Sequence, residues 1–105
     1  MKEINPKELK SRLDRGEEWQ VIDVREEHEL DICKITDTHI PMGEIVSRAS
    51  ELRQDCSVVI HCRSGKRAEA VIHTLEEKFD LTNLYNLTGG ILGWAEEVDI
   101  NLERY

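Results

Sequence analysis

The sequence predicts an α/β fold: a single small domain over residues 1–105, with a parallel sheet of four to five strands flanked by helices on both faces. Short apolar, β-branched runs alternate along the chain with segments whose apolar residues recur at helical spacing. This alternation favours a parallel sheet, because each crossover helix returns the chain to the same end of the sheet and covers one of its faces. A chain of 105 residues suffices for one such core and no second domain.

The first predicted elements are a helix and a strand. Asn5 can cap a helix that has Pro6 at its first position, with Glu8 completing a capping box. Gly16 is typical of a residue that ends such a helix. Residues 19–23 are largely apolar and follow that glycine closely, so they predict a buried strand.

The middle of the chain carries a weaker pattern. Residues 26–30 predict a short helical turn, and residues 32–39 predict an irregular segment that could hold one short strand. Ile45, Ala49 and Leu52 then recur at helical spacing. This part of the chain is therefore expected to be helical in places and irregular in others.

The second half repeats the strand and helix alternation clearly. Residues 58–61 are β-branched and predict a buried strand, and residues 84–87 predict another. Between them, residues 68–79 place apolar side chains on one helical face, and residues 91–98 do the same at the end of the chain. These elements complete the predicted parallel sheet with its covering helices.

The candidate site is the stretch Cys-Arg-Ser-Gly-Lys-Arg at residues 62–67, which lies between a strand and a helix. Successive amides in such a turn can point inward as an anion-binding nest, and the following helix adds the positive end of its dipole. Arg63, Lys66 and Arg67 add positive charge close to Cys62. These effects favour the thiolate over the thiol, and the thiolate is the nucleophilic form. Ligands of parallel α/β sheets bind beyond the carboxyl ends of the strands, where this stretch is expected.

The size of this loop indicates the chemistry. Four residues separate Cys62 from Arg67, one fewer than in tyrosine-phosphatase-type loops. The tighter ring suits a terminal persulfide sulfur better than a phosphoryl group, which disfavours a phosphatase or an arsenate reductase. The stretch resembles the active loop of the rhodanese family of sulfurtransferases. Further segments resemble that family in the same order: Val-Ile-Asp-Val-Arg-Glu at 21–26, His-Ile-Pro at 39–41, and Leu-Thr-Gly-Gly-Ile at 87–91 with Trp94.

The resemblance implies a rhodanese-like sulfurtransferase that moves a sulfane sulfur from thiosulfate or another persulfide donor to a thiophilic acceptor. Cys62 would attack the donor and carry the sulfur as a persulfide, stabilised by the amides of residues 63–67. The expected partners are a small anionic sulfur donor and a thiol or cyanide acceptor, with a protein donor or acceptor as a further possibility.

An alternative is a sulfur-carrier or protein-interaction module that receives persulfide from a protein and turns over little small-molecule donor. It is suggested by the lack of a second domain and by the variant segment His-Ile-Pro-Met-Gly-Glu at residues 39–44. This segment resembles the rhodanese domains fused to ubiquitin-like-protein activating enzymes.

The other residues of the loop have expected roles. Arg67 is expected to hold the loop and bind the anionic end of the donor, while Arg63 and Lys66 face solvent at the mouth and steer anions. The plainer alternative for all three is a solvated charge. Ser64 could donate a hydrogen bond to the sulfur or simply suit the turn. Gly65 allows a close backbone approach that a Cβ would prevent.

Residues outside the loop are expected to support it. By resemblance, Asp23 and Arg25 form a pair that braces the active loop; a purely structural ion pair is the alternative. His61 precedes Cys62 in the strand, so its side chain points to the opposite face and a Cys–His dyad is rejected. Trp94 is expected in the core, with a pocket-lining role by family position as the alternative.

The remaining thiols are not expected to take part directly. Cys56 precedes the strand that leads to Cys62, which places the two about 20 Å apart at ~3.3 Å per strand residue. Cys33 lies in the irregular segment and is not expected to be a second acceptor. His28, His39 and His73 lack ligand spacing, so no metal is expected. No cofactor is expected either.

Composition bounds the setting. The net charge is −8, which argues against nucleic acid or an anionic membrane as a partner. The three cysteines form no Cys-x-x-Cys pair, and the first residues lack the apolar run of a signal peptide. A reduced, cytoplasmic setting and a soluble monomer are therefore expected.

Overall fold

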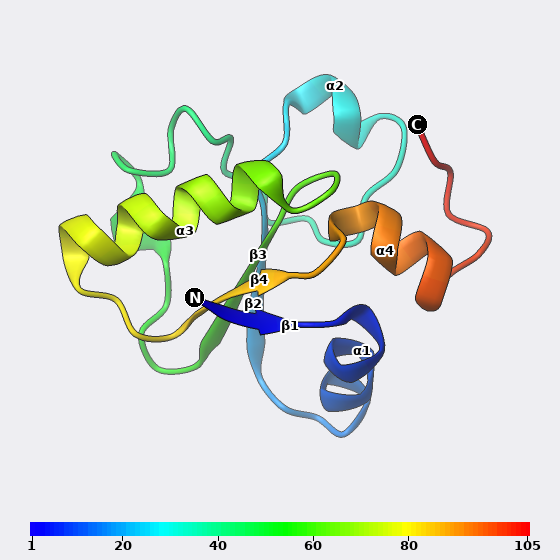
Figure 1. Cartoon of the computed structure of the whole chain (residues 1–105), viewed down its shortest axis with the longest axis horizontal. Coiled ribbons are helices and arrows are strands. Elements are labelled where there is room, and N and C mark those ends of the chain that lie inside the picture. Colours follow the sequence, from blue (N-terminus) through cyan, green and yellow to red (C-terminus); the bar gives the residue numbers. More distant parts are fainter.

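The fold follows from a computed structural model that describes all residues from Met1 to Tyr105 (Figure 1). Strands and helices alternate along most of the chain, as the sequence predicts. In chain order the elements are β1 (Lys2–Ile4), α1 (Pro6–Asp14), β2 (Trp19–Asp23), α2 (Glu27–Leu30), a 3₁₀ helix (Ala49–Glu51), β3 (Ser57–His61), α3 (Lys66–Phe79), β4 (Leu84–Leu87) and α4 (Gly90–Glu97).

The four strands form one parallel sheet in the order β1-β4-β3-β2. This confirms the predicted parallel sheet and fixes its strand number at four. The strand β1 at one edge was not predicted, since three residues are too few to show an alternating pattern. The strand that residues 32–39 could have held is reduced to a single bridge between Asp23 and His39. No helix of the protein is both long enough and apolar enough to cross a membrane.

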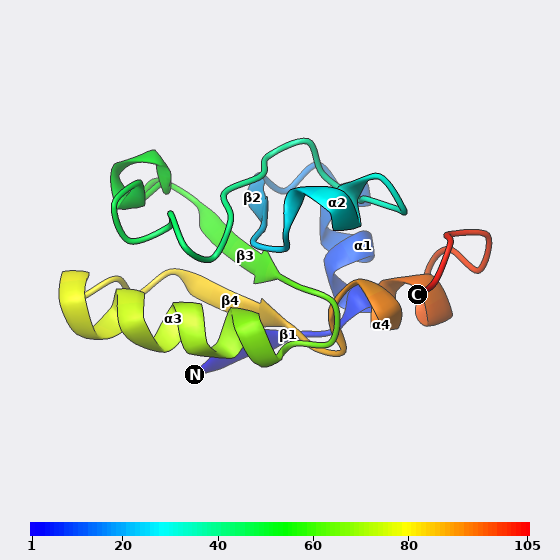
Figure 2. The ribbon, with the colours of Figure 1, turned by 90° about the horizontal axis from the view of Figure 1, so that it is seen from above.

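Helices cover both faces of the sheet (Figures 1 and 2). On one face α3 packs over β3 and β4, and a buried cluster joins Val58 and Ile60 of the sheet to Val71 and Leu75 of the helix. On the other face Leu9 of α1 packs in a second buried cluster with apolar residues of β1, β3 and β4. Trp94 packs against this second cluster, as expected for a core residue.

The predicted cap of α1 is confirmed, whereas the capping box and the helix around Ile45 are not. Asn5 does cap α1, because its side chain accepts a hydrogen bond of 2.8 Å from the amide of Glu8. The Glu8 side chain does not close a capping box and pairs instead with Arg12 at 3.0 Å. In the segment around Ile45, only Ala49–Glu51 forms a short 3₁₀ helix, and the rest consists of turns.

Candidate active site

The loop that follows β3 carries Cys62 beyond the carboxyl end of that strand, as the alternation predicts. The sulfur of Cys62 accepts hydrogen bonds from two main-chain amides, those of Gly65 at 3.1 Å and Ala68 at 3.5 Å. The residue is only 1% exposed and also touches the apolar cluster beneath α3. The thiol is therefore buried, yet it faces main-chain donors rather than apolar side chains alone.

Four more amides surround the same turn without a hydrogen-bond acceptor in the protein, those of Arg63, Ser64, Lys66 and Arg67. Gly65 has a φ of +112°, a conformation that L side chains rarely adopt. This left-handed residue lets the turn reverse direction and pass directly into α3. Free amides at a helix N-terminus are suited to an anion.

The first turn of α4 fixes the loop from outside. The amide of Ile91 donates to the carbonyl of Cys62 at 2.9 Å, and the amide of Leu92 donates to the carbonyl of Arg63 at 3.1 Å. Gly90 has a φ of +59° and lies so close to the main chain of Cys62 and Arg63 that there is no room for a side chain. The glycine pair before α4 therefore shapes the site, although its residues lie far from Cys62 in the sequence.

Arg67 leaves the loop toward α2. Its guanidinium makes two hydrogen bonds to the carboxylate of Glu29, at 2.7 and 2.9 Å. The hydroxyl of Tyr105 donates to the same carboxylate at 2.7 Å. Hydrogen bonds from Arg67 hold the pKa of Glu29 well below its usual range, despite the opposing effect of burial. Glu29 is therefore an anion that joins the loop to α2.

A second ion pair lies beside this one and is fully buried. Arg25 binds Asp23 through Nη2 at 2.7 Å, and both side chains are 0% exposed. Burial is the largest single influence and raises the pKa of Asp23, but the hydrogen bonds from Arg25 and the nearby positive charge together lower it overall. Arg25 also donates to the carbonyl of Glu29 at 3.3 Å and to the hydroxyl of Tyr105 at 2.8 Å. The pair thus contacts the residues that hold Arg67, although neither member touches Cys62.

His61 lies on the opposite side of β3 from Cys62. Its Nε2 is 3.6 Å from Oδ2 of Asp23, and its Nδ1 is 3.2 Å from the main-chain oxygen of Cys62. No hydrogen bond joins the imidazole to the Cys62 sulfur. Burial lowers the pKa of His61, which favours the neutral ring. This geometry agrees with the rejection of a Cys–His dyad.

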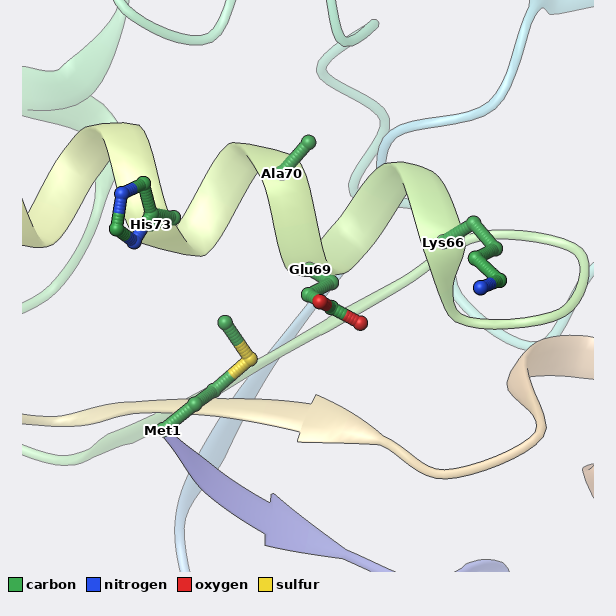
Figure 3. A pocket seen from close by; sticks show the side chains of 5 residues that line it. All are labelled: Met1, Lys66, Glu69, Ala70 and His73. Carbon is green, nitrogen blue, oxygen red and sulfur yellow. The ribbon is translucent and has the colours of Figure 1, made fainter.

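The remaining loop cations lie in different surroundings. The guanidinium carbon of Arg63 lies 4.8 Å from the centre of the Tyr105 ring. Lys66 lines a pocket of about 390 Å³ beside the first turns of α3, together with Met1, Glu69, Ala70 and His73 (Figure 3). Arg63 thus contacts Tyr105 and Arg67 contacts Glu29 of α2, whereas Lys66 faces the neighbourhood of β1. Neither Arg63 nor Lys66 forms an ion pair.

The other two cysteines lie outside the loop. Cys33 is buried beside Arg25, whose Nη2 donates to its carbonyl at 2.7 Å. Cys56 is half-buried and directly precedes β3, so it lies at the end of the strand opposite to Cys62. Its carbonyl accepts a hydrogen bond of 2.8 Å from the side chain of Asn83.

Three residues of the site were not found from the sequence, Glu29, Asn86 and Tyr105, and Gly90 was noted only as part of the segment 87–91 without a role at the site. Asn86 is buried in β4 and donates to the carbonyl of Gly65 at 3.3 Å. For Gly90 a signal existed, because two adjacent glycines precede an apolar helix. Glu29 and Tyr105 gave no local signal, since their contacts join residues 38 and 76 positions apart.

Comparison with known proteins identifies the family to which this fold belongs. The family model of the rhodanese-like domain matches residues 5–97, so the chain belongs to the rhodanese-like domain family. It is 36% identical over 95 residues to a protein named sulfurtransferase from Allochromatium vinosum, covering 89% of this chain and 87% of that protein. It is 31% identical over 98 residues to "Putative sulfur carrier protein YrkF" of Bacillus subtilis, covering 92% of this chain but only 52% of that protein.

Solved structures show the same architecture. The crystal structure of a rhodanese-like domain protein from Staphylococcus aureus superimposes with a TM-score of 0.82 at 29% identity. The match covers 100% of this chain and 99% of that one. The predicted family and fold are therefore both confirmed.

Proposed function

We propose that this protein is a sulfurtransferase in which Cys62 carries the transferred sulfur as a persulfide. Membership in the rhodanese-like family and the relative named sulfurtransferase support sulfur transfer in general. The observation that carries the proposal for this chain is the turn around Cys62, where two amides donate to the sulfur. The proposed donor is thiosulfate or another sulfane sulfur compound.

The transfer takes place in two displacements. In the first, the Cys62 thiolate attacks the outer sulfur of thiosulfate. The sulfur–sulfur bond of the donor breaks, its electron pair leaves with sulfite, and a Cys62 persulfide anion remains. In the second, cyanide or a thiolate attacks the outer sulfur of the persulfide. Thiocyanate or a new persulfide leaves, and the Cys62 thiolate is regenerated without any external oxidant or reductant.

The main chain of the loop supports both displacements. Negative charge moves from the Cys62 sulfur to the outer sulfur when the persulfide forms. The amides of Arg63, Ser64, Lys66 and Arg67 are free to donate to that outer sulfur. Preorganised donors of this kind stabilise developing charge, because they need no reorganisation during the reaction.

A second candidate function is a sulfur carrier that exchanges persulfide with a protein partner. The relative named sulfur carrier favours it, and so does the 1% exposure of Cys62, which restricts free access to the thiol. On this alternative the chemistry at Cys62 is unchanged. The donor is then a protein persulfide, and turnover with thiosulfate is slow.

Intact mass spectrometry tests the proposal. After incubation with excess thiosulfate, the protein should gain the mass of one sulfur atom, and cyanide should remove it. Cys62→Ser should not gain the mass, whereas Cys56→Ser, the matched loss of a thiol at the other end of β3, should gain it normally. A gain that persists in Cys62→Ser would contradict the role of Cys62. Slow loading from thiosulfate with fast loading from a cysteine desulfurase would favour the carrier.

A further inference from the structure

The main-chain carbonyl of Cys62 has two hydrogen-bond partners on the side of the loop away from the sulfur. The amide of Ile91 donates to it at 2.9 Å, and Nδ1 of the His61 imidazole lies 3.2 Å from it. A carbonyl oxygen has two lone pairs, so these partners use its full capacity. A Cβ on Gly90 would lie 2.7 Å from the same oxygen, which shows how closely α4 packs against it. The Cys62 carbonyl is therefore fixed in position by both a side chain and α4.

The position of this carbonyl also sets the direction of the next amide, that of Arg63. In a trans peptide the C=O and the following N–H point in opposite directions, and every peptide bond of the protein is trans. The carbonyl points toward α4, whose Trp94 packs on one face of the sheet, whereas the Cys62 side chain lies in the cluster beneath α3 on the other face. The Arg63 amide therefore points toward the face that holds the sulfur, and it has no acceptor within the protein.

The imidazole of His61 is held so that Nδ1 is its donor. The ring is 0% exposed, and its Nε2 lies 3.6 Å from Oδ2 of Asp23 without a hydrogen-bond partner. Oδ2 already accepts from Nε and Nη2 of Arg25, at 3.1 and 2.7 Å. Burial lowers the pKa of His61, so the ring carries a single proton at neutral pH. A carbonyl can only accept, so that proton lies on Nδ1 when the imidazole binds Cys62.

We propose that His61 is a positioning residue for sulfur transfer: as the Nδ1–H tautomer it holds the Cys62 carbonyl and thereby directs the Arg63 amide at the outer sulfur of the persulfide. The amides that donate to the resting sulfur are those of Gly65 and Ala68, so the contribution of His61 is made after the persulfide forms. This assignment rests on the proposed function of Cys62. The tautomer and the surroundings of the Arg63 amide, however, can be measured without any sulfur transfer.

Three variants of His61 separate the hydrogen bond from the bulk of the ring. The amide nitrogen of an asparagine is as many bonds from Cα as Nδ1 of histidine, so His61→Asn keeps a donor for the Cys62 carbonyl. The amide nitrogen of His61→Gln corresponds to Nε2 instead, and His61→Phe keeps a ring without any donor. Loading of Cys62 from thiosulfate should slow about tenfold in the Gln and Phe variants and stay within about threefold of wild type in the Asn variant.

The matched control is His73→Gln, which changes an exposed histidine on α3 and should load normally. Circular dichroism and the melting temperature of each variant establish that it is folded. Loading at the wild-type rate by both His61→Gln and His61→Phe would overturn the proposal, and so would an equal loss in His61→Asn and His61→Phe.

Alkylation of Cys62 by iodoacetamide distinguishes positioning from general support of the fold. This reaction uses the same thiolate but forms no outer sulfur for the Arg63 amide to bind. In His61→Phe the alkylation rate should stay within about twofold of wild type, while loading from thiosulfate falls about tenfold. A parallel loss of both rates would mean that His61 only supports the fold, and the proposal would be wrong.

Nuclear magnetic resonance tests the geometry directly. Proton–nitrogen spectra of the imidazole at pH 7 should show the Nδ1–H tautomer of His61, and the Nε2–H tautomer or the imidazolium would overturn the proposal. The amide resonance of Arg63 should move in His61→Phe and stay near its wild-type position in His61→Asn. If wild-type protein takes no sulfur from thiosulfate or from a cysteine desulfurase, the proposed function of Cys62 fails. The tautomer and the Arg63 resonance still decide whether His61 holds this peptide.

Discussion

A methyl group placed on Gly90 would lie 2.4 Å from the main-chain oxygen of Arg63. The backbone of Gly90 at the start of α4 therefore packs directly against the backbone of the active loop. The amide of Ile91 donates to the carbonyl of Cys62 in the same contact. The loop around the sulfur is consequently supported by main-chain atoms from a segment almost thirty positions later in the sequence.

Gly90→Ala should therefore displace the loop. The new Cβ would clash with backbone that no flexible side chain can relieve, and the φ of +59° adds strain. We expect sulfur loading of Cys62 to slow more than tenfold and the melting temperature to fall. Gly43→Ala is the matched control, since nothing lies within 4 Å of its added Cβ, and it should behave like wild type. Normal loading by Gly90→Ala would contradict the packing described for this turn.

Arg67→Lys should weaken the attachment of the loop to α2. A lysine keeps the charge but lacks the planar guanidinium, whose two nitrogens each donate to one carboxylate oxygen of Glu29. We expect a several-fold slower loading of Cys62 and a modest loss of thermal stability. Arg48→Lys changes a half-buried arginine that also binds carboxylates, on the segment before β3 and away from the active loop, and should leave loading unchanged. The two variants are compared by intact mass after timed exposure to thiosulfate.

Arg25→Met should be strongly destabilising. It would leave Asp23 as a buried carboxylate without its partner, and such a loss costs about 3–5 kcal/mol in the free energy of unfolding. Arg53→Met removes an arginine that pairs with exposed carboxylates, so it should change the unfolding free energy little. Urea denaturation followed by circular dichroism measures both. A small effect of Arg25→Met would show that the buried pair is dispensable for folding.

Acid should weaken the protein through Glu29. Because the pKa of Glu29 is lower in the folded chain than the value of about 4.3 in an unfolded one, the carboxylate stabilises the fold above that pH. This contribution is lost as the pH falls below about 4. The stability difference between wild type and Glu29→Gln should thus be constant from about pH 7 to 5 and shrink toward pH 2. Urea denaturation at each pH gives this difference, and one that grew on acidification would have the wrong sign.

Much of the fold could be predicted because its elements carry local patterns. Residues 19–23 and 84–87 are strands with the predicted bounds, and the helix after Cys62 begins at Lys66. The strand β1 escaped prediction because its place is set by pairing with β4 rather than by its own three residues. Ile45, Ala49 and Leu52 recur at helical spacing, yet their segment forms only turns and one 3₁₀ helix. Ile45 reaches the core from a turn.

The site divides in the same way. The turn of Cys62 and its amides could be predicted from the local order of strand, cysteine, glycine and helix. The ion pair of Arg67 with Glu29, and the hydrogen bond from Tyr105 to that carboxylate, could not be predicted. These residues lie far apart in the sequence and meet only in the folded protein. The roles expected for Arg63, Ser64, Lys66 and Arg67 remain predictions. The structure adds that Arg67 is paired with Glu29 and that Arg63 lies against the ring of Tyr105.

The 1% exposure of Cys62 affects how long its thiolate stays intact. The Cys62 sulfur is screened from peroxides in solution, which oxidise the thiolates that they can reach. Burial of the Cys62 sulfur therefore protects the nucleophile from oxidation between one transfer and the next.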